Sequence, residues 1–134
     1  MTLVNWTDLY RLGIPQIDDD HERLVALLEG VLEAIRVSDP AEVATARLDV
    51  FTAEAEAHFA REEGLLDRAN YPGLAAHRAE HDRLISHLRH MRMTFHDGRP
   101  AGDDSRMATA LRDWLFRHIR EDDAAYKPSV LRLV

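Results

Sequence analysis

Five histidines recur along the apolar faces of segments whose residue spacing is typical of amphipathic helices. His58 lies four residues before Glu62, and His77 lies four residues before His81, so each pair shares one helical face. An unpaired polar group in an apolar core costs about several kcal/mol, whereas a metal ion accepts the lone pairs of such side chains. The spacing therefore predicts a metal site. Its candidate ligands are His21, His58, Glu62, His77, His81, His118 and either Asp122 or Asp123.

The types and number of these ligands indicate which metals would bind. The chain contains no cysteine, so a thiolate site is excluded, and imidazole with carboxylate suits iron, zinc, copper or manganese. Seven ligands are too many for one ion and suit two, with both carboxylates bridging. Given one bridging oxygen, three histidines complete six-coordination at one ion, and two histidines leave the other ion with a vacancy. A vacancy of this kind is suited to a small ligand.

Three further histidines, all on the predicted third helix, test the selectivity of this pattern. At about 100° per residue, His87 and His90 point about 240° and 180° away from His81. His96 returns to the same face but lies about 22 Å along the helix axis. We expect all three to lie outside the metal site.

The residues that carry the predicted ligands form four amphipathic helices behind an N-terminal arm. In the first helix, Leu24, Leu28 and Val31 recur at spacings of four and three, which is typical of a buried helical face. Short connections favour antiparallel neighbours, so the predicted fold class is all-α, an up-down-up-down four-helix bundle. A chain of 134 residues suits a single domain. We expect an arm over roughly 1–16 and helices over roughly 18–37, 40–67, 73–96 and 104–124, within one domain over 1–134.

Capping residues define the expected helix starts. Asp18 or Asp19 is a favourable N-cap for the first helix, and Asp39 with Pro40 suits the N-cap and first helical position of the second. In such a bundle the first and third helices start where the second and fourth end. The candidate ligands lie near those starts and ends, so they should meet in one layer of the core.

Charge and hydropathy limit the partners and the location. The formal net charge is -7, which argues against binding to a phosphate backbone. No apolar stretch approaches the roughly 18 residues of a membrane span, and the N-terminus lacks the pattern of a signal peptide. We expect a cytoplasmic protein that binds no nucleic acid and has no membrane span.

Four motifs of the chain resemble those of the hemerythrin family, in particular the single-domain bacterial hemerythrins. They are NWTDLYRLGIPQIDDDHERL, HFAREE, YPGLAAHRAEH and WLFRHIREDDAAY, and the match runs from about Trp6 to Tyr126. The resemblance implies a non-haem diiron centre with a bridging oxo or hydroxo group. It implies that His77, His81 and His118 hold the six-coordinate iron, and that His21 and His58 hold the iron with the vacancy. Glu62 and a C-terminal aspartate would bridge the two irons.

The choice between the two aspartates sets helical geometry against the resemblance. Asp122 lies four residues after His118, about 40° around the helix, whereas Asp123 lies about 140° around it. The family keeps four residues between this histidine and its bridging aspartate, which favours Asp123. A bridging carboxylate must reach between two irons, and a local π-type widening of the helix would help it to do so. We therefore expect Asp123 to be the bridge.

The resemblance also implies an apolar pocket beside the iron with the vacancy. Its expected lining is Phe59, Leu66, Leu115 and Ile119, each beside a candidate ligand or one to two turns from one. Such a lining would exclude water and offer no proton donor that could promote cleavage of the O–O bond of a bound dioxygen. Leu66 stands where many relatives have methionine, so the shape of the pocket can differ here.

The implied function is reversible dioxygen binding for storage, transport or delivery, without enzymatic activity. An oxygen-consuming enzyme is a candidate recipient. The alternatives are a diiron enzyme, such as a peroxidase or ferroxidase, and an oxygen sensor that acts through a partner. Histidine-rich ligation favours dioxygen binding, because helix bundles that build high-valent iron use more carboxylate ligands.

Overall fold

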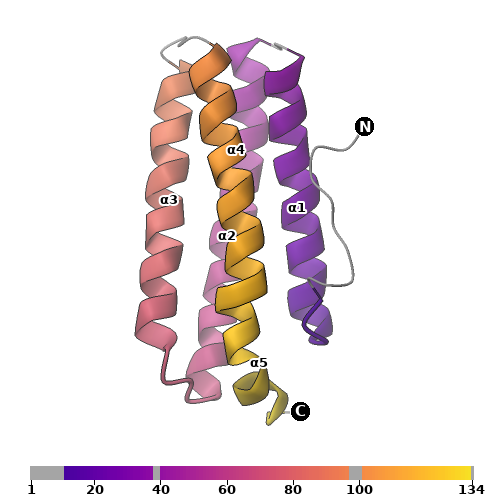
Figure 1. Cartoon of the computed structure of the whole chain (residues 1–134), viewed down its shortest axis with the longest axis vertical. Coiled ribbons are helices and arrows are strands. Elements are labelled where there is room, and N and C mark those ends of the chain that lie inside the picture. The colour runs from indigo at the N-terminus through magenta and orange to yellow at the C-terminus, as the bar shows by residue number, and fades with distance from the viewer. Residues whose placement is uncertain (1–10, 38–39, 97–100, 134) are drawn as a thin grey trace.

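The computed structural model describes residues 11–37, 40–96 and 101–133, without the side chains of residues 96 and 101–105. Four long helices run side by side in this part of the chain, which contains no strand, and two shorter elements extend the fourth helix (Figure 1). The predicted all-α four-helix bundle is confirmed. The elements are α1 (Pro15–Arg36), α2 (Ala41–Arg68), α3 (Leu74–His96), α4 (Ala101–Arg117), the π-helix η2 (His118–Asp123) and α5 (Ala124–Leu131).

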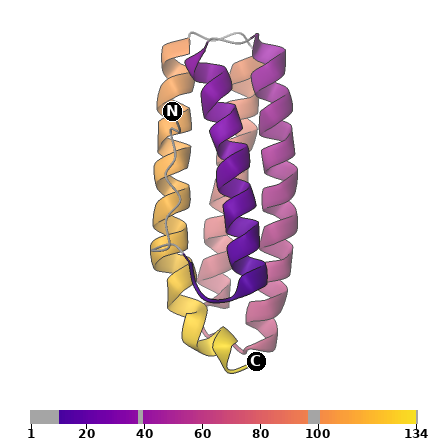
Figure 2. The ribbon, with the colours of Figure 1, turned by 90° about the vertical axis from the view of Figure 1, so that its right-hand side faces the viewer.

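Successive long helices run in opposite directions. Figure 1 and the orthogonal view in Figure 2 show α1 and α3 starting at the end of the bundle where α2 and α4 finish. The π-helix and α5 lie at this same end. None of the described helices has the length and apolarity that a membrane crossing requires.

The first helix begins earlier than its sequence predicts. It starts at Pro15 with Ile14 as N-cap, because proline supplies a helical φ at the first position, where no intrahelical bond is needed. Asp18 is therefore inside α1. Its carboxylate accepts hydrogen bonds from the backbone N–H groups of Leu12, at 2.7 Å, and Gly13, at 3.0 Å. Asp18 therefore links the preceding segment to α1 and does not cap the helix. Gly13 has φ +80°, a conformation that favours glycine.

The other helix boundaries differ from prediction by smaller shifts or by an added element. Pro40 is the N-cap of α2 and not its first residue, and Asp39 lies outside the described residues. The fourth helix starts at Ala101 rather than near 104. The chain also remains helical beyond 124, as α5, because Tyr126 and Val130 are both buried.

Two apolar clusters fill the bundle. The main core lies between the four long helices and includes Leu28, Val31, Leu48, Phe51, Leu88 and Met91. The end cluster consists of Leu12, Ile14, Ile17, Leu65, Leu66, Tyr126 and Val130. Along α1, His21 lies between Ile17 of the end cluster and Leu24 of the main core. The predicted ligands thus form a buried polar layer between the two clusters.

Candidate metal centre

All seven predicted ligand side chains meet in this polar layer, and each is at most 4% exposed. They form two groups, within each of which the potential ligand atoms lie no more than 4.8 Å apart. One group contains His77, His81 and His118, and the other contains His21 and His58. Glu62 and Asp123 belong to both groups.

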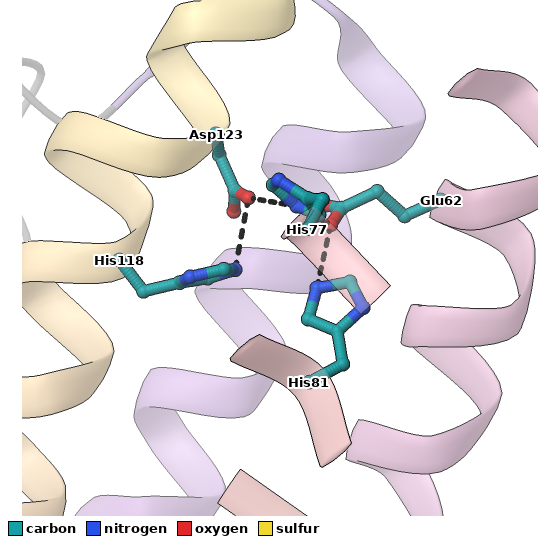
Figure 3. A group of neighbouring side chains, drawn as sticks. All are labelled: Glu62, His77, His81, His118 and Asp123. Atoms are coloured by element: carbon teal, nitrogen blue, oxygen red, sulfur yellow. Dashed lines mark hydrogen bonds and ion pairs between the residues drawn. The ribbon is translucent and has the colours of Figure 1, made fainter. Parts of the chain in front are cut away.

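The three-histidine group takes one oxygen from each carboxylate. Glu62 Oε1 lies 2.7 Å from His77 Nε2 and 3.0 Å from His81 Nε2. Asp123 Oδ1 lies 2.9 Å from His77 Nε2 and 3.0 Å from His118 Nε2. The five side chains point toward one another from α2, α3 and η2 (Figure 3).

The two-histidine group takes the remaining oxygen of each carboxylate. Glu62 Oε2 lies 3.1 Å from His58 Nε2 and 3.8 Å from His21 Nε2. Asp123 Oδ2 lies 3.0 Å from His21 Nε2. Each carboxylate therefore divides its two oxygens between the two groups, as a carboxylate that bridges two metal ions must do.

The π-helix explains why Asp123, and not Asp122, faces the centre. The segment His118–Asp123 is wound with a wider turn than an α-helix, so the residue five positions after His118 returns to its face. Asp123 is 1% exposed and lies in the polar layer. Asp122 is 39% exposed in its side chain and contacts the opposite ring nitrogen of His118, with Oδ2 at 3.0 Å from Nδ1.

The donor set fits a metal. Among the described residues, His81 Nε2, His118 Nε2 and Asp123 Oδ1 are buried atoms whose close contacts, at 2.9 and 3.0 Å, lack the geometry of a hydrogen bond. Leaving them so would destabilise the fold, whereas coordination would use their lone pairs. Imidazole nitrogens with carboxylate oxygens suit iron among other first-row metals.

Protons compete with a metal ion for the imidazole nitrogens of the polar layer. Burial opposes a charge on His77, but Asp123 and Glu62 outweigh that effect and raise the pKa of His77 to about 10. The pKa of His21 is raised in the same way to about 9. Burial also opposes a charge on Glu62, but the surrounding histidines hold its pKa well below the ordinary value. Metal binding should therefore release protons from the imidazoles.

Carboxylates outside the centre contact the outer nitrogens of three of the histidines. Asp20 Oδ2 lies 2.8 Å from His58 Nδ1, and Glu63 Oε2 lies 2.8 Å from His81 Nδ1. Asp122 takes this place at His118. Sequence reasoning missed Asp20 and Glu63 as part of the site. Each is the sequence neighbour of a predicted ligand, but that position does not reveal which histidine the carboxylate reaches.

Aromatic residues enclose the polar layer. Phe59 stacks on His81 at a centroid distance of 3.8 Å, and Trp114 stacks on His118 at 4.7 Å. The Tyr126 hydroxyl donates to Glu62 Oε2 at 3.0 Å. Burial, reinforced by the charge of Glu62, raises the pKa of Tyr126. The hydroxyl therefore keeps its proton and remains a hydrogen-bond donor.

The four expected pocket residues are all buried, but they fall in two different apolar clusters. Phe59, Leu115 and Ile119 are buried in the main core, whereas Leu66 belongs to the end cluster. His87 and His90 are exposed, as expected for histidines outside the metal site. The side chain of His96 lies outside the described part of the chain.

Comparisons with known proteins identify the family of this chain. The model of the hemerythrin HHE cation binding domain matches residues 12–130. A bacteriohemerythrin of Stenotrophomonas maltophilia is 36% identical, over 97% of this chain and 83% of its own length. One of Pseudomonas aeruginosa is 33% identical, over 93% of this chain and 80% of its own. A wild-type hemerythrin crystal structure matches with a TM-score of 0.85 at 26% identity, covering 96% of this chain and 98% of that one. The chain belongs to the hemerythrin family.

Proposed function

We propose that this protein binds dioxygen reversibly at a diiron centre held by the seven side chains of the polar layer. The family is one of oxygen-binding diiron proteins. The proposal rests on the orientation of two carboxylates, Glu62 and Asp123. Each points one oxygen toward the three-histidine group and the other toward the two-histidine group. That unequal count leaves room for one small ligand at the two-histidine group.

Each side chain has a distinct role in this proposal. His77, His81 and His118 would hold one iron, and His21 and His58 would hold the other. Glu62 and Asp123 would bridge them beside an oxo or hydroxo group. When bound, the iron pair supplies the two electrons that reversible dioxygen binding requires.

The surrounding side chains would protect the bound gas. Phe59, Leu115 and Ile119 are buried, and Phe59 stacks on His81. All three side chains offer only carbon atoms, so they would exclude water and donate no proton. The contribution of Leu66, from the end cluster, would be indirect. The Tyr126 hydroxyl donates a hydrogen bond to Glu62 Oε2, which orients that carboxylate. These features favour release of intact dioxygen over O–O cleavage.

The proposed physiological role is storage, transport or delivery of dioxygen in the cytoplasm, with an oxygen-consuming enzyme as recipient. An acidic chain with net charge -7 suits a soluble carrier.

The test is anaerobic reduction of the iron-loaded protein followed by exposure to air. We expect about two irons per chain and uptake of about one dioxygen, which vacuum should release. Iron content, absorption spectra and gas uptake measure this. Saturation at one iron would contradict the diiron centre. Repeated turnover of peroxide or ferrous iron without recoverable dioxygen would replace the carrier function with a peroxidase or ferroxidase activity. Oxygen-dependent binding of a signalling partner would instead indicate a sensor.

A further inference from the structure

Three histidines of the metal centre are held from both ring nitrogens. In each, Nε2 lies toward the shared carboxylates, while Nδ1 contacts an outer carboxylate. The outer pairs are His58 with Asp20 at 2.8 Å, His81 with Glu63 at 2.8 Å, and His118 with Asp122 at 3.0 Å. A proton on Nδ1 can be donated to these acceptors, which leaves the Nε2 lone pair for a metal.

Arginines hold two of the three outer carboxylates. Glu63 accepts a hydrogen bond from Arg78 Nε at Oε1, at 3.1 Å, while its other oxygen faces His81. Asp20 accepts from Arg61 Nε at 3.1 Å, and a second nitrogen of the same guanidinium lies 3.0 Å from Oδ1. Both oxygens of each carboxylate are thus engaged, so neither carboxylate can rotate without losing a contact.

The third outer carboxylate is held less firmly. Among the residues that the structure describes, Asp122 forms no ion pair with an arginine. Its side chain is 39% exposed, against 24% for Glu63 and 10% for Asp20. Water screens an exposed charge more strongly, so its effect on an imidazole is weaker.

We infer that Glu63 and Asp20 are positioning residues of the metal centre, acting through His81 and His58, with Asp122 a weaker member of the same set. The inference rests on the proposed diiron function. An anionic acceptor on Nδ1–H fixes the ring and its tautomer, and it makes Nε2 a more basic ligand. A more basic ligand stabilises ferric iron more than ferrous iron. The outer carboxylates would therefore set both the affinity for metal and the ease of oxidation.

The chain supplies a matched control for Glu63. Asp49, also on α2, accepts a hydrogen bond from Arg92 of α3 at 2.7 Å. It therefore links the same two helices through an arginine, as Glu63 does through Arg78. Asp49 belongs to none of the potential metal-binding groups. A variant at Asp49 thus reports the loss of a helix-to-helix ion pair alone.

The first experiment measures binding of cobalt(II) to the metal-free protein and its variants, without iron or oxygen. We expect Glu63→Ala to lower the affinity about tenfold or more and Asp49→Ala to leave it within about twofold. Glu63→Gln keeps an acceptor for His81 and should recover most of the affinity. Circular dichroism checks that every variant is folded. Equal affinities for Glu63→Ala and Asp49→Ala would overturn the inference.

The second experiment measures the midpoint potential and autoxidation rate of the iron-loaded protein. We expect Glu63→Gln to raise the potential and slow autoxidation, because it removes the charge while keeping the contact. Asp49→Asn should match the parent, and Asp122→Asn should move in the same direction as Glu63→Gln but less. A potential for Glu63→Gln equal to that of Asp49→Asn would overturn the electronic part of the inference.

The two experiments separate this inference from the proposed function. If the parent binds two cobalt ions but its iron form takes up no dioxygen, the carrier function fails while the cobalt affinities still decide the role of Glu63. A parent that binds no divalent metal would overturn both proposals.

Discussion

Two regions of the bundle, the main core and the polar layer, bury opposite chemistries. Away from the metal centre, α1 contributes Leu28 and Val31 to a wholly apolar main core, and α2 contributes Leu48 and Phe51. About two turns before Leu28, nearer the start of α1, the same face carries His21. The main core is stabilised by the apolar surface that folding removes from water. The polar layer is stabilised only where its lone pairs and charges find partners.

This difference separates what holds the fold from what binds the metal. Replacing a large side chain of the main core by a small one should weaken folding and leave the metal site intact. A change in the polar layer should remove metal and weaken folding, because a bound metal stabilises the native state and because the remaining buried charges lose a partner.

The largest effect on folding is expected for Phe51→Ala. Phe51 is fully buried in the main core, and such a truncation costs about 3–5 kcal/mol. Denaturant unfolding of the iron-loaded variant should show this loss, while an assay of the folded protein should still find about two irons per chain. Loss of iron at unchanged stability would contradict the separation of the two regions.

Asp123→Ala should lower the free energy of unfolding by about 3 kcal/mol, because removing this carboxylate leaves the charges around it buried and unpaired. Iron content should fall, and the absorption spectrum of the oxygenated form should disappear.

The matched variant Asp122→Ala should keep its iron and nearly the parent spectrum, because its side chain lies outside the polar layer. If Asp122→Ala lost iron while Asp123→Ala retained it, the role of the π-helix proposed here would be wrong.

An intermediate effect is expected for Leu115→Ala, which should cost about 2–3 kcal/mol through the cavity that it leaves. Leu115 is 2% exposed and is adjacent to Phe116 and three residues before His118. Iron content should stay at the parent level, but autoxidation should become faster because water reaches the bound gas. Stopped-flow spectra of the oxygenated protein measure the rate. A rate equal to that of the parent would exclude Leu115 from the pocket.

The smallest effect is expected for Leu66→Met, a change that roughly conserves volume and costs less than about 1.5 kcal/mol. Leu66 packs in the end cluster with Tyr126 rather than with Leu115. The autoxidation rate should therefore stay close to that of the parent. A marked change in that rate would return Leu66 to the lining of the pocket, as the family resemblance implied.

Much of the architecture was predictable from local patterns. The spacing of apolar residues predicted four helices, and the placement of the histidines near helix starts and ends predicted one polar layer. Helix boundaries were less predictable. Asp18 resembles an N-cap in sequence, yet its carboxylate binds the amides of Leu12 and Gly13. Competing uses of one polar side chain cannot be ranked without the fold.

The geometry around the ligands required long-range contacts. Plain helical spacing favoured Asp122, and only the wider winding of His118–Asp123 brings Asp123 into the layer. The partners of Asp20 and Glu63 lie on other helices, 38 and 18 residues away in sequence. No local pattern specifies such pairs.

The sequence by itself determined which residue types face the core, and thereby the family, the helical bundle and the set of candidate ligands. A periodicity of 3.6 residues is a local property, so it can be recognised without tertiary contacts. The tertiary structure decided which oxygen of Glu62 and of Asp123 faces which histidines, and which carboxylates stand behind the imidazoles. These depend on the separation and rotation of packed helices, which arise only when side chains distant in sequence interlock.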